Sequence, residues 1–372
     1  MCRAAGELTM AVKVLVVDDS VVYRRVLSEA LRSLPDVEVV GSVANGSLVV
    51  AKVRELGPDL ITLDIEMPGM NGIQVMDALR QASLDVKVLV ISSLTMSGGK
   101  LTLQALQNGA FDFITKPTEA NPEENFRCIR EELAPRIRAV GHRLDVQNIL
   151  RSGMATAKRA EAAPALKASP IAGTLVRRKP EMVVIGVSTG GPNALAEIFS
   201  ALPGDMGVPI LIVQHMPPIF TQLLAANLSA HSAVPVREAK HNEEILRNTA
   251  YIAPGGRHMR LIPGVSGARI LQLSDDPPEN CCRPAVDYLF RSVANHFPGK
   301  ALAIILTGMG EDGTAGLRLL KQGGATVIAQ DEASSVVYGM PKAAVEAGVA
   351  DMVLPLSAMA ERISSLVRGW PA

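Results

Sequence analysis

The sequence predicts two α/β units, each built around a doubly wound, mostly parallel β-sheet. Apolar runs of strand length alternate with segments of helical period over roughly 12–135 and again over 181–370, as in α/β folds with parallel sheets. A segment of different composition separates these stretches, and 372 residues suit two hydrophobic cores better than one. We therefore expect domains at 12–135 and 181–372, joined by a linker at 136–180.

Composition excludes several classes of protein. The 37 basic and 37 acidic residues balance, so no net charge draws the chain to nucleic acid. No apolar run approaches the about 18 residues of a membrane helix, and the N-terminus lacks a secretory pattern. The four cysteines show no metal-ligand spacing, and Cys281 and Cys282 are adjacent, which disfavours a disulfide between them. We expect a soluble cytoplasmic protein that does not bind nucleic acid.

The segment 141–179 is rich in Ala, Lys, Arg and Pro and has few large apolar residues. Such a composition is typical of a polar tether. A short helix is expected near 143–151. The excess of basic residues leaves open a second interpretation, docking of an acidic partner.

In the first unit, acidic residues follow two predicted strands. The run VKVLVVDDS ends in Asp18 and Asp19, and DLITLDIEMPGMNG places Asp64 at the end of the third strand. Carboxyl ends of parallel strands share one edge of a sheet, so these carboxylates are expected to converge. Three carboxylates form an oxygen-rich pocket of the kind that Mg²⁺ prefers.

Two further strands bring polar groups to the same edge. VKVLVISSL ends near Ser92, and GAFDFITKP places Lys116 before a proline. A metal ion and an ammonium around one carboxylate would neutralise an incoming phosphoryl group, which the carboxylate can accept as a nucleophile. Each aspartate alone is equally explained as a helix cap, but five matching features favour a phosphoryl site.

This set of residues resembles the response-regulator receiver domain, over nearly all of 12–130. The resemblance implies a five-stranded flavodoxin-like fold in which Asp64 is phosphorylated. It implies that Ser92 and Lys116 contact the phosphoryl oxygens. The implied Mg²⁺ ligands are Asp18, Asp19, Asp64 and the backbone carbonyl of Glu66.

The second unit opens with VVIGVSTGGP, a buried strand that stops in a turn carrying Ser188. A phosphate loop of the Walker type requires Lys-Ser or Lys-Thr after the glycines, whereas Pro192 and Asn193 follow here. GVSTG matches the G-x-S-x-G pattern, in which glycines expose a serine nucleophile on a sharp turn. Ser188 as the cap of the helix predicted over NALAEIF is an equally good interpretation of this window.

A serine nucleophile needs a base and an acid that orients the base. PILIVQHMPP places His215 at the end of a buried run, and His258 in APGGRHMRL is a second candidate; the other four histidines look like surface residues. ALAIILTGMGEDG ends in a glycine-rich loop that carries Asp312 and offers backbone N–H groups for an oxyanion. The order Ser, His, Asp differs from that of α/β-hydrolases. A helix-cap role for Asp312 stays open.

The motifs GVSTGGP, QHMP, APGGRHM, CRPAVDYLF, LTGMGEDG and YGMPKAA together resemble the catalytic domain of the chemotaxis receptor methylesterase (CheB) family, over about 181–370. The resemblance implies that Ser188, His215 and Asp312 are catalytic and that no metal or other cofactor serves this site. It also implies further substrate and oxyanion residues. These are Thr189, His258 and the backbone N–H of Met309.

One segment departs from the family pattern. Members commonly carry His before the Arg-Pro pair and Ser after it, where this chain has Cys282 and Ala285. We expect the departure to affect substrate contacts and none of the three catalytic positions.

The resemblance implies a phosphorylation-regulated hydrolase that demethylates glutamate γ-methyl esters on chemoreceptors and also deamidates receptor glutamines. The implied phosphate donor is a histidine kinase, and contact with the membrane would be only through the receptors. The receiver is expected to cover the active site until Asp64 is phosphorylated. Two other functions remain: a serine esterase of small molecules, and a receiver joined to a binding module without activity.

Overall fold

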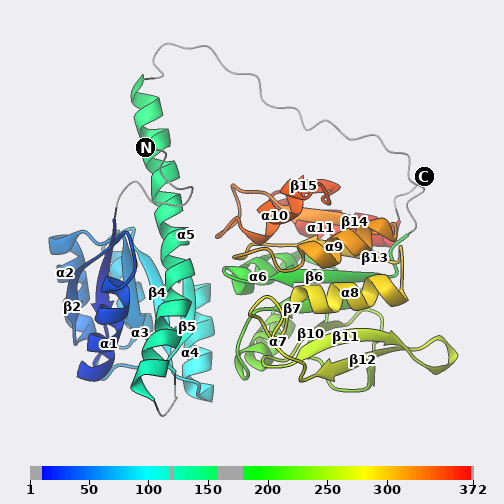
Figure 1. Cartoon of the computed structure of the whole chain (residues 1–372), viewed down its shortest axis with the longest axis horizontal. Helices are drawn as coiled ribbons and strands as arrows, with labels where there is room; N and C mark the ends of the chain where they lie inside the picture. Colours follow the sequence, from blue (N-terminus) through cyan, green and yellow to red (C-terminus); the bar gives the residue numbers. More distant parts are fainter. Residues whose placement is uncertain (1–10, 118–120, 157–178, 370–372) are drawn as a thin grey trace. The chain divides into compact units, whose positions relative to one another are not determined.

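The computed structural model describes residues 11–117, 121–156 and 179–369. The chain divides into two compact units, Met1–Pro170 and Ile171–Ala372, which are considered separately below (Figure 1). The expected domain limits, 12–135 and 181–372, remain predictions, and much of the predicted linker lies outside the described residues. Within the described ranges, no helix is both long and apolar enough to span a bilayer.

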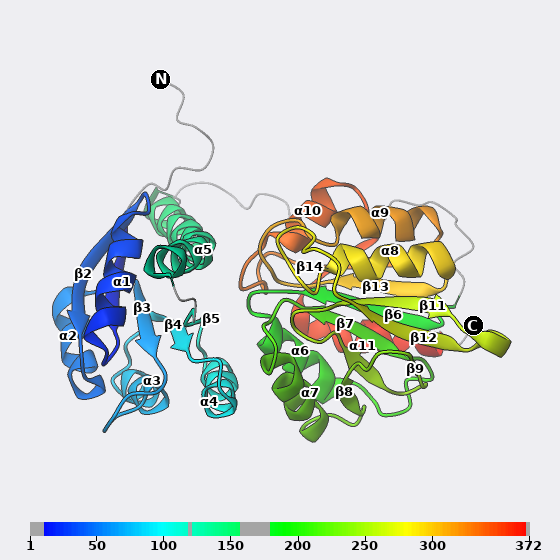
Figure 2. The ribbon, with the colours of Figure 1, turned by 60° about the horizontal axis from the view of Figure 1, so that its bottom comes forward.

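The first unit is a five-stranded parallel sheet in the order β2-β1-β3-β4-β5. Helices α1 and α5 pack together on one face of the sheet, and α2, α3 and α4 cover the other (Figure 2). The strands are β1 (Val12–Val17), β2 (Val37–Val43), β3 (Leu60–Asp64), β4 (Lys87–Ser92) and β5 (Asp112–Thr115). The helices are α1 (Val21–Arg32), η1 (Gly46–Leu48), α2 (Val49–Leu56), α3 (Gly72–Gln81), α4 (Met96–Gln107) and α5 (Pro122–Thr156).

Helix caps set where the chain turns away from the sheet in this unit. The Ser20 side chain accepts a hydrogen bond from the Tyr23 N–H and starts α1 just after β1. Asn71 and Gln74 form a reciprocal capping box at the start of α3. Because these caps lie beyond the strand ends, the intervening residues are left at the carboxyl edge of the sheet. Helix α5 continues through the short helix expected at 143–151.

The second unit contains a seven-stranded parallel sheet in the order β15-β14-β13-β6-β7-β10-β8 and a small antiparallel sheet in the order β11-β12-β9. The strands of the large sheet are β6 (Met182–Val187), β7 (Ile210–Gln214), β8 (Val236–Glu238), β10 (Ala250–Ile252), β13 (Ala301–Ile305), β14 (Thr326–Gln330) and β15 (Met352–Leu354). Those of the small sheet are β9 (Glu243–Glu244), β11 (His258–Pro263) and β12 (Arg269–Ser274).

Helices cover both faces of the large sheet. In Figures 1 and 2, α8, α9 and the β11–β12 hairpin lie on one side, while α6, α7 and α11 lie on the other. The helices are α6 (Gly191–Ala201), α7 (Phe220–Ala230), η2 (Val265–Gly267), α8 (Val286–His296), α9 (Thr314–Gln322), α10 (Met340–Glu346) and α11 (Leu356–Arg368). The prediction of two mostly parallel α/β units is confirmed.

The strand order places a topological switch point beside β6. The chain runs from β6 to β7 on one side, and later strands, beginning with β13, are added on the other side. In open parallel sheets, ligands bind at the carboxyl ends of strands where the order reverses. Residues just after β6, β7 and β13 are therefore the first place to look for a functional site.

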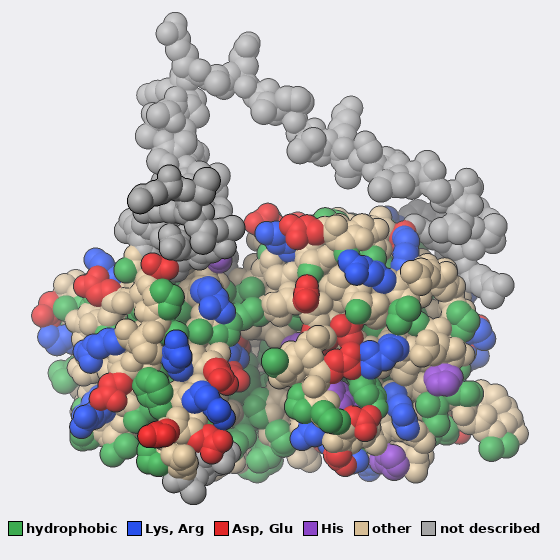
Figure 3. Space-filling view, viewed as in Figure 1, with side chains coloured by type: hydrophobic (Ala, Val, Ile, Leu, Met, Phe, Trp, Pro, Cys, Tyr) green, Lys and Arg blue, Asp and Glu red, His purple; other side chains and the backbone are tan. Residues whose placement is uncertain are grey.

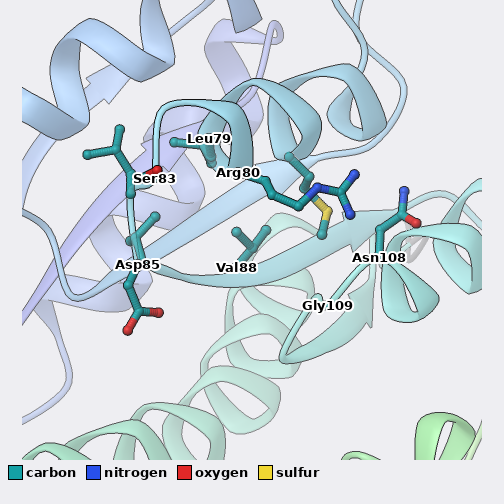
Figure 4. Close-up of a pocket in the computed structure, with 10 residues that line it drawn as sticks. Leu79, Arg80, Ser83, Asp85, Val88, Asn108 and Gly109 are labelled. Atoms are coloured by element: carbon teal, nitrogen blue, oxygen red, sulfur yellow. The ribbon is translucent and has the colours of Figure 1, made fainter.

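The surface shown in Figure 3 carries acidic and basic side chains intermixed over both units, in keeping with the balanced charge of the sequence. A surface pocket of the first unit lies between α3, the start of β4 and the turn before β5 (Figure 4). Leu79, Arg80, Asp85, Val88 and Asn108 are among the residues that line it. These residues are at the amino ends of β4 and β5, so the pocket is at the sheet edge opposite Asp64.

Candidate phosphorylation site and active site

The first unit gathers two buried carboxylates around one ammonium group. Asp18 and Asp64 are 0% and 2% exposed. Lys116 Nζ lies 2.7 Å from Asp64 Oδ2 and 3.0 Å from Asp18 Oδ2. The ring of Tyr23 lies under this ammonium, with its centroid 4.6 Å from Nζ. The predicted convergence of these strand-end residues is present in the structure.

Asp64 is held in an environment that opposes its charge. Burial raises the pKa of Asp64 from 3.8 to about 6, although hydrogen bonding and charge attraction from Lys116 lower it, and Asp18 raises it further. The Glu66 N–H donates to Asp64 Oδ1 at 3.2 Å. A carboxylate that is buried and only partly compensated is a suitable nucleophile for a phosphoryl group once a cation balances its charge.

Three acidic side chains fit a divalent cation. Oxygens of Asp18, Asp19 and Asp64 all lie within 4.8 Å of one another. Asp18 Oδ2 is buried and accepts no hydrogen bond from any described residue, although it pairs with Lys116. An oxygen-only donor set with an unfilled buried acceptor matches the preference of Mg²⁺. A Mg²⁺ role for the Glu66 carbonyl stays a prediction, while the Glu66 side chain accepts hydrogen bonds from Ser93 and Ser97.

Ser92 is fully buried at the end of β4. Its Oγ accepts a hydrogen bond from Thr102 Oγ1 at 2.7 Å and donates to the Ser93 carbonyl at 3.3 Å. The hydroxyl is therefore oriented from α4. A contact between Ser92 and a phosphoryl group stays a prediction.

In the second unit, Ser188 directly follows β6 and does not cap helix α6. The N-cap of α6 is Gly190, which has φ of 78°, and no side chain caps this helix. The Ser188 carbonyl accepts hydrogen bonds from the Gly191 N–H at 2.8 Å and from Gln214 Nε2 at 2.9 Å. The helix-cap interpretation of Ser188 is therefore wrong, and its hydroxyl is not used by α6.

The backbone after β13 packs closely against Ser188. A Cβ on Gly308 would lie 2.7 Å from the Ser188 Cβ, so only glycine fits. The Ser188 N–H donates to the Thr307 carbonyl at 3.0 Å. No hydrogen bond of the Met309 N–H is found among the described residues. The Met309 N–H, one residue after the close approach of Gly308 to Ser188, is therefore a candidate hydrogen-bond donor to an oxyanion.

His215 follows β7 and is oriented by Asp312. His215 Nε2 lies 2.8 Å from Asp312 Oδ2, and the two side chains are 13% and 4% exposed. In the neutral ring Nε2 carries the proton donated to Asp312, which leaves Nδ1 as the acceptor. Within the described ranges no hydrogen bond joins Ser188 Oγ to His215, and such bonds are often long in unliganded active sites.

Asp312 accepts four hydrogen bonds, and two of them come from the start of α8. Oδ2 accepts from His215 and from the Val286 N–H at 2.7 Å. Oδ1 accepts from the Asp287 N–H at 3.0 Å and from Asn280 Nδ2 at 2.8 Å. Asp312 therefore caps a helix, but the helix is α8 rather than the neighbouring α9, whose N-cap is Gly313. The capping and catalytic interpretations of Asp312 are compatible.

The same contacts shift the pKa values of the pair in opposite directions. Burial raises the pKa of Asp312, but His215 and the backbone N–H groups of α8 outweigh burial and hold it below 3.8. Burial lowers the pKa of His215, while hydrogen bonds with Asp312 and Cys282 raise it to about 9. At pH 7 the resting site therefore holds an ionised carboxylate beside an imidazolium.

The second nitrogen of His215 faces a thiol. Cys282 Sγ lies 3.6 Å from His215 Nδ1. We expected the departure at Cys282 to affect substrate contacts; in the structure Cys282 also contacts His215 directly. Sequence spacing could not show this, because Cys282 belongs to a loop 67 residues away from His215.

His258 is buried in the protein interior. It is 0% exposed; Nε2 lies 3.1 Å from the Pro277 carbonyl, and Nδ1 accepts from the Ala285 N–H at 3.2 Å. Its ring also stacks on Tyr288, with centroids 4.4 Å apart. Both nitrogens thus hold the loop before α8, and no ring nitrogen remains to bind substrate. Thr189 is 5% exposed, and its carbonyl accepts from Thr307 Oγ1.

His215, Cys282 and Asp312 also form a possible metal cluster, with ligand atoms within 4.8 Å of one another. The carboxylate of Asp312 is already saturated by its four donors. A metal ion bound there would have to displace at least one of them. The arrangement fits a proton relay better than a metal centre.

Fold and sites together define the class of the protein. A parallel α/β unit with buried aspartates and a lysine at one sheet edge precedes a second α/β unit with a paired histidine and aspartate at the edge that also carries Ser188. Such a chain is a response regulator with an enzymatic output domain.

Comparisons with known proteins identify the family. Residues 14–123 match the response regulator receiver domain, and residues 183–363 match CheB methylesterase. The chain is 45% identical over 369 residues to a protein-glutamate methylesterase/protein-glutamine glutaminase of Desulfotalea psychrophila, covering 96% of this chain and 98% of that protein. A protein of the same name from Trichodesmium erythraeum is 42% identical, covering 94% and 97%. The chain belongs to the CheB family of protein-glutamate methylesterases/protein-glutamine glutaminases.

Two solved structures are similar to separate parts of the chain. The CheB methylesterase catalytic domain of Thermotoga maritima is 44% identical, with a TM-score of 0.49, and covers 50% of this chain and 99% of its own. The response regulator domain of Thermotoga maritima CheB is 43% identical, with a TM-score of 0.32, and covers 36% and 97%. The predicted family and the kinds of its two domains are confirmed by the family matches and the curated relatives.

Proposed function

We propose that the second domain hydrolyses glutamate γ-methyl esters on cytoplasmic regions of chemoreceptors, with Ser188 as nucleophile, and deamidates receptor glutamines at the same site. The observation that carries this proposal is the His215–Asp312 pair. Asp312 engages Nε2, so Nδ1 is the nitrogen that must accept a proton. Val187 pairs with Gln214 in the sheet, so Ser188 and His215 are the next residues on adjacent strands.

In the proposed reaction, His215 Nδ1 removes the Ser188 Oγ proton as Oγ attacks the ester carbonyl carbon. The resulting oxyanion is stabilised by the Met309 N–H. The imidazolium then protonates the leaving methoxide, which departs as methanol. Water, deprotonated by His215, attacks the acyl-enzyme. The bond to Ser188 Oγ then breaks, Oγ takes the proton back from His215, and the carboxylate is released. With glutamine as substrate, ammonia leaves in place of methanol.

Asp312 has a fixed supporting role in this scheme. Its four donors hold both oxygens, so it keeps the His215 ring in one tautomer and stabilises the imidazolium. Neutral His215 is required as the base. Because the pKa of His215 is raised to about 9, turnover should increase as pH rises from 7 toward 9.

We also propose that a histidine kinase supplies the phosphoryl group and that Asp64 Oδ accepts it. Mg²⁺, held by Asp18, Asp19, Asp64 and the Glu66 carbonyl, would supply positive charge against the repulsion between carboxylates and phosphoryl oxygens. Lys116 supplies a second positive charge at 2.7 Å from Asp64. Ser92 contacts the phosphoryl group from the end of β4. Phosphorylation then raises the esterase activity of the full chain.

The test is methanol release from membranes that contain methylated chemoreceptors, with and without a small phosphodonor. We expect full-length protein to release methanol, more quickly with the phosphodonor. Ser188→Ala should lose this activity, whereas Ser200→Ala, an exposed serine of α6, should keep it. Rapid hydrolysis of a small chromogenic ester without methanol release from receptors would overturn the substrate assignment and favour a small-molecule esterase.

A further inference from the structure

Cys282 completes a second chain of nucleophile, base and orienting acid in the active site. Its Sγ lies 3.6 Å from His215 Nδ1, and Asp312 lies 2.8 Å from the opposite nitrogen. Within the described residues, Cys282 is the one nucleophilic side chain in hydrogen-bond contact with His215. Loss of its proton makes a thiol reactive, and His215 Nδ1 is the base within hydrogen-bond reach of Cys282 Sγ.

The turn that carries Cys282 is held from several sides. Glu279 and Cys282 exchange both backbone hydrogen bonds, at 3.1 and 2.9 Å. The two residues between them, Asn280 and Cys281, have φ of 53° and 60°, as a type I′ hairpin turn requires. Arg291 binds both carboxylate oxygens of Glu279 at 2.7 Å. The position of Sγ beside Nδ1 is therefore built into the fold.

The thiol is also reachable. Cys282 is partly exposed, and the adjacent Cys281 is exposed. Among the described residues, no hydrogen bond joins Cys281 to His215, so the two adjacent cysteines allow a comparison within one loop of a thiol that contacts the imidazole and one that does not.

We propose that Cys282 is a modification site through which hydroperoxides and small thiol-directed electrophiles inactivate the esterase. The inference rests on the proposed function, because the loss it predicts is loss of Ser188-dependent hydrolysis. In the proposed mechanism, His215 Nδ1 accepts the proton of Ser188 Oγ. The same nitrogen lies 3.6 Å from Cys282 Sγ. A group attached to Sγ therefore stands where the Ser188 proton must be delivered.

With hydrogen peroxide, the thiol proton first passes from Sγ to His215 Nδ1 in molecules whose imidazole is neutral. The thiolate sulfur attacks one peroxide oxygen, the O–O bond breaks and an S–O bond forms. The departing hydroxide takes the proton from the imidazolium and leaves as water. Sulfur is oxidised to sulfenic acid and peroxide is reduced, and an added thiol reverses the change. With iodoacetamide, the S–C bond forms as iodide leaves.

The experiment treats full-length protein with iodoacetamide, or with hydrogen peroxide, at pH 7. Peptide mass spectrometry measures labelling at each cysteine, and ester hydrolysis is assayed in parallel. We expect Cys282 to react at least about tenfold faster than Cys281, and hydrolysis to fall in step with labelling of Cys282. Cys281→Ser should be inactivated like the native chain, and Cys282→Ser should resist. His215→Ala should slow labelling of Cys282 by about tenfold.

Two results would overturn the proposal. One is equal labelling of Cys282 in the native chain and in His215→Ala. The other is full hydrolytic activity after complete modification of Cys282. The labelling rates need no esterase assay, so they test the thiol–imidazole pair even if the proposed substrate is wrong. An absence of methanol release from untreated native protein would instead count against the proposed function alone.

Discussion

The two domains each place a buried aspartate at the carboxyl edge of a parallel sheet, yet the pKa values of these aspartates shift in opposite directions. Burial raises the pKa of both. Asp64 has one lysine, one backbone N–H and a second carboxylate as neighbours, and its pKa rises to about 6. Asp312 has a histidine, an asparagine amide and two N–H groups of a helix start, and its pKa falls below the ordinary value.

The opposite pKa shifts of Asp64 and Asp312 match two different roles. Asp64 retains unsatisfied charge that a metal ion and a phosphoryl group can engage, so it is suited to form a covalent bond. Asp312 has both oxygens saturated and is suited to hold a histidine in place. Hydrogen-bond donors, rather than burial or residue type, determine which role an aspartate takes.

The largest expected effect concerns Asp64, the proposed acceptor of the phosphoryl group. Asp64→Ala should abolish phosphorylation by a small phosphodonor in the presence of Mg²⁺, because Asp64 is the proposed acceptor of the phosphoryl group, and its Oδ2 lies 2.7 Å from Lys116 Nζ. Asp85→Asn, which removes an aspartate whose side chain is 95% exposed, is the control and should be phosphorylated normally. Phosphate found on Ser92 would contradict the assignment. Incorporation is measured by intact mass.

The next effect concerns Asp312, which orients His215. Asp312→Asn should lower methyl ester hydrolysis by about 10²–10⁴-fold, because an amide cannot stabilise the imidazolium and favours the wrong tautomer. Asp287→Asn is the matched control: its Oδ1 accepts the Gly316 N–H at 2.6 Å without touching His215. Because an asparagine oxygen can still accept this N–H, the variant should keep its cap and lose much less activity. Equal rate losses in the two variants would indicate that both act only through folding.

A smaller effect concerns the pH dependence of hydrolysis. Cys282 raises the pKa of His215 together with Asp312, so Cys282→Ala should lower that pKa. The rise of activity with pH, which reflects deprotonation of His215, should then move to lower pH. Cys281→Ala should leave the profile in place. An unchanged profile in Cys282→Ala would show that the thiol does not act on the base.

The smallest effect is on stability. The pKa of Asp64 is higher in the folded state than its ordinary value of 3.8, so its contribution to stability is full below about pH 3.8 and is lost as pH rises through about 6. An asparagine at this position does not ionise, so its contribution to stability does not change over that pH range. Asp64→Asn should therefore stabilise the receiver by about 1–3 kcal/mol at pH 7 relative to its effect at pH 4. Denaturant unfolding at the two pH values, followed in the receiver, measures this difference, and no pH dependence would contradict it.

Strand-end residues were the predictable part of both sites. Asp18, Asp64 and Lys116 converge because they follow strands of one parallel sheet, and the alternation of strands and helices is visible in the sequence. The same argument placed Ser188 and His215 at the same edge of the second sheet. For such residues, the order of strands and helices along the chain is sufficient to predict the site, because a parallel sheet brings the carboxyl ends of its strands to one edge.

Residues that come from loops were not predictable in this way. Asn280 and Cys282 reach the site through a two-residue turn with positive φ at both positions, which Cys281 adopts without being glycine. The role of Asp312 as cap of α8 depends on packing between α8 and α9, to which sequence spacing gives no access. The family resemblance implied that His258 belongs to the substrate site, but its ring nitrogens lie within hydrogen-bond distance of the backbone of Pro277 and Ala285.

The central claim is that His215 Nδ1 activates Ser188 rather than Cys282 for hydrolysis. Methanol release from methylated receptor membranes by Ser188→Ala and by Cys282→Ala, both phosphorylated and at pH 8, tests it most directly. The account predicts a loss of orders of magnitude in Ser188→Ala and retained release in Cys282→Ala. Retained release in Ser188→Ala with its loss in Cys282→Ala would contradict the account and make the thiol the nucleophile.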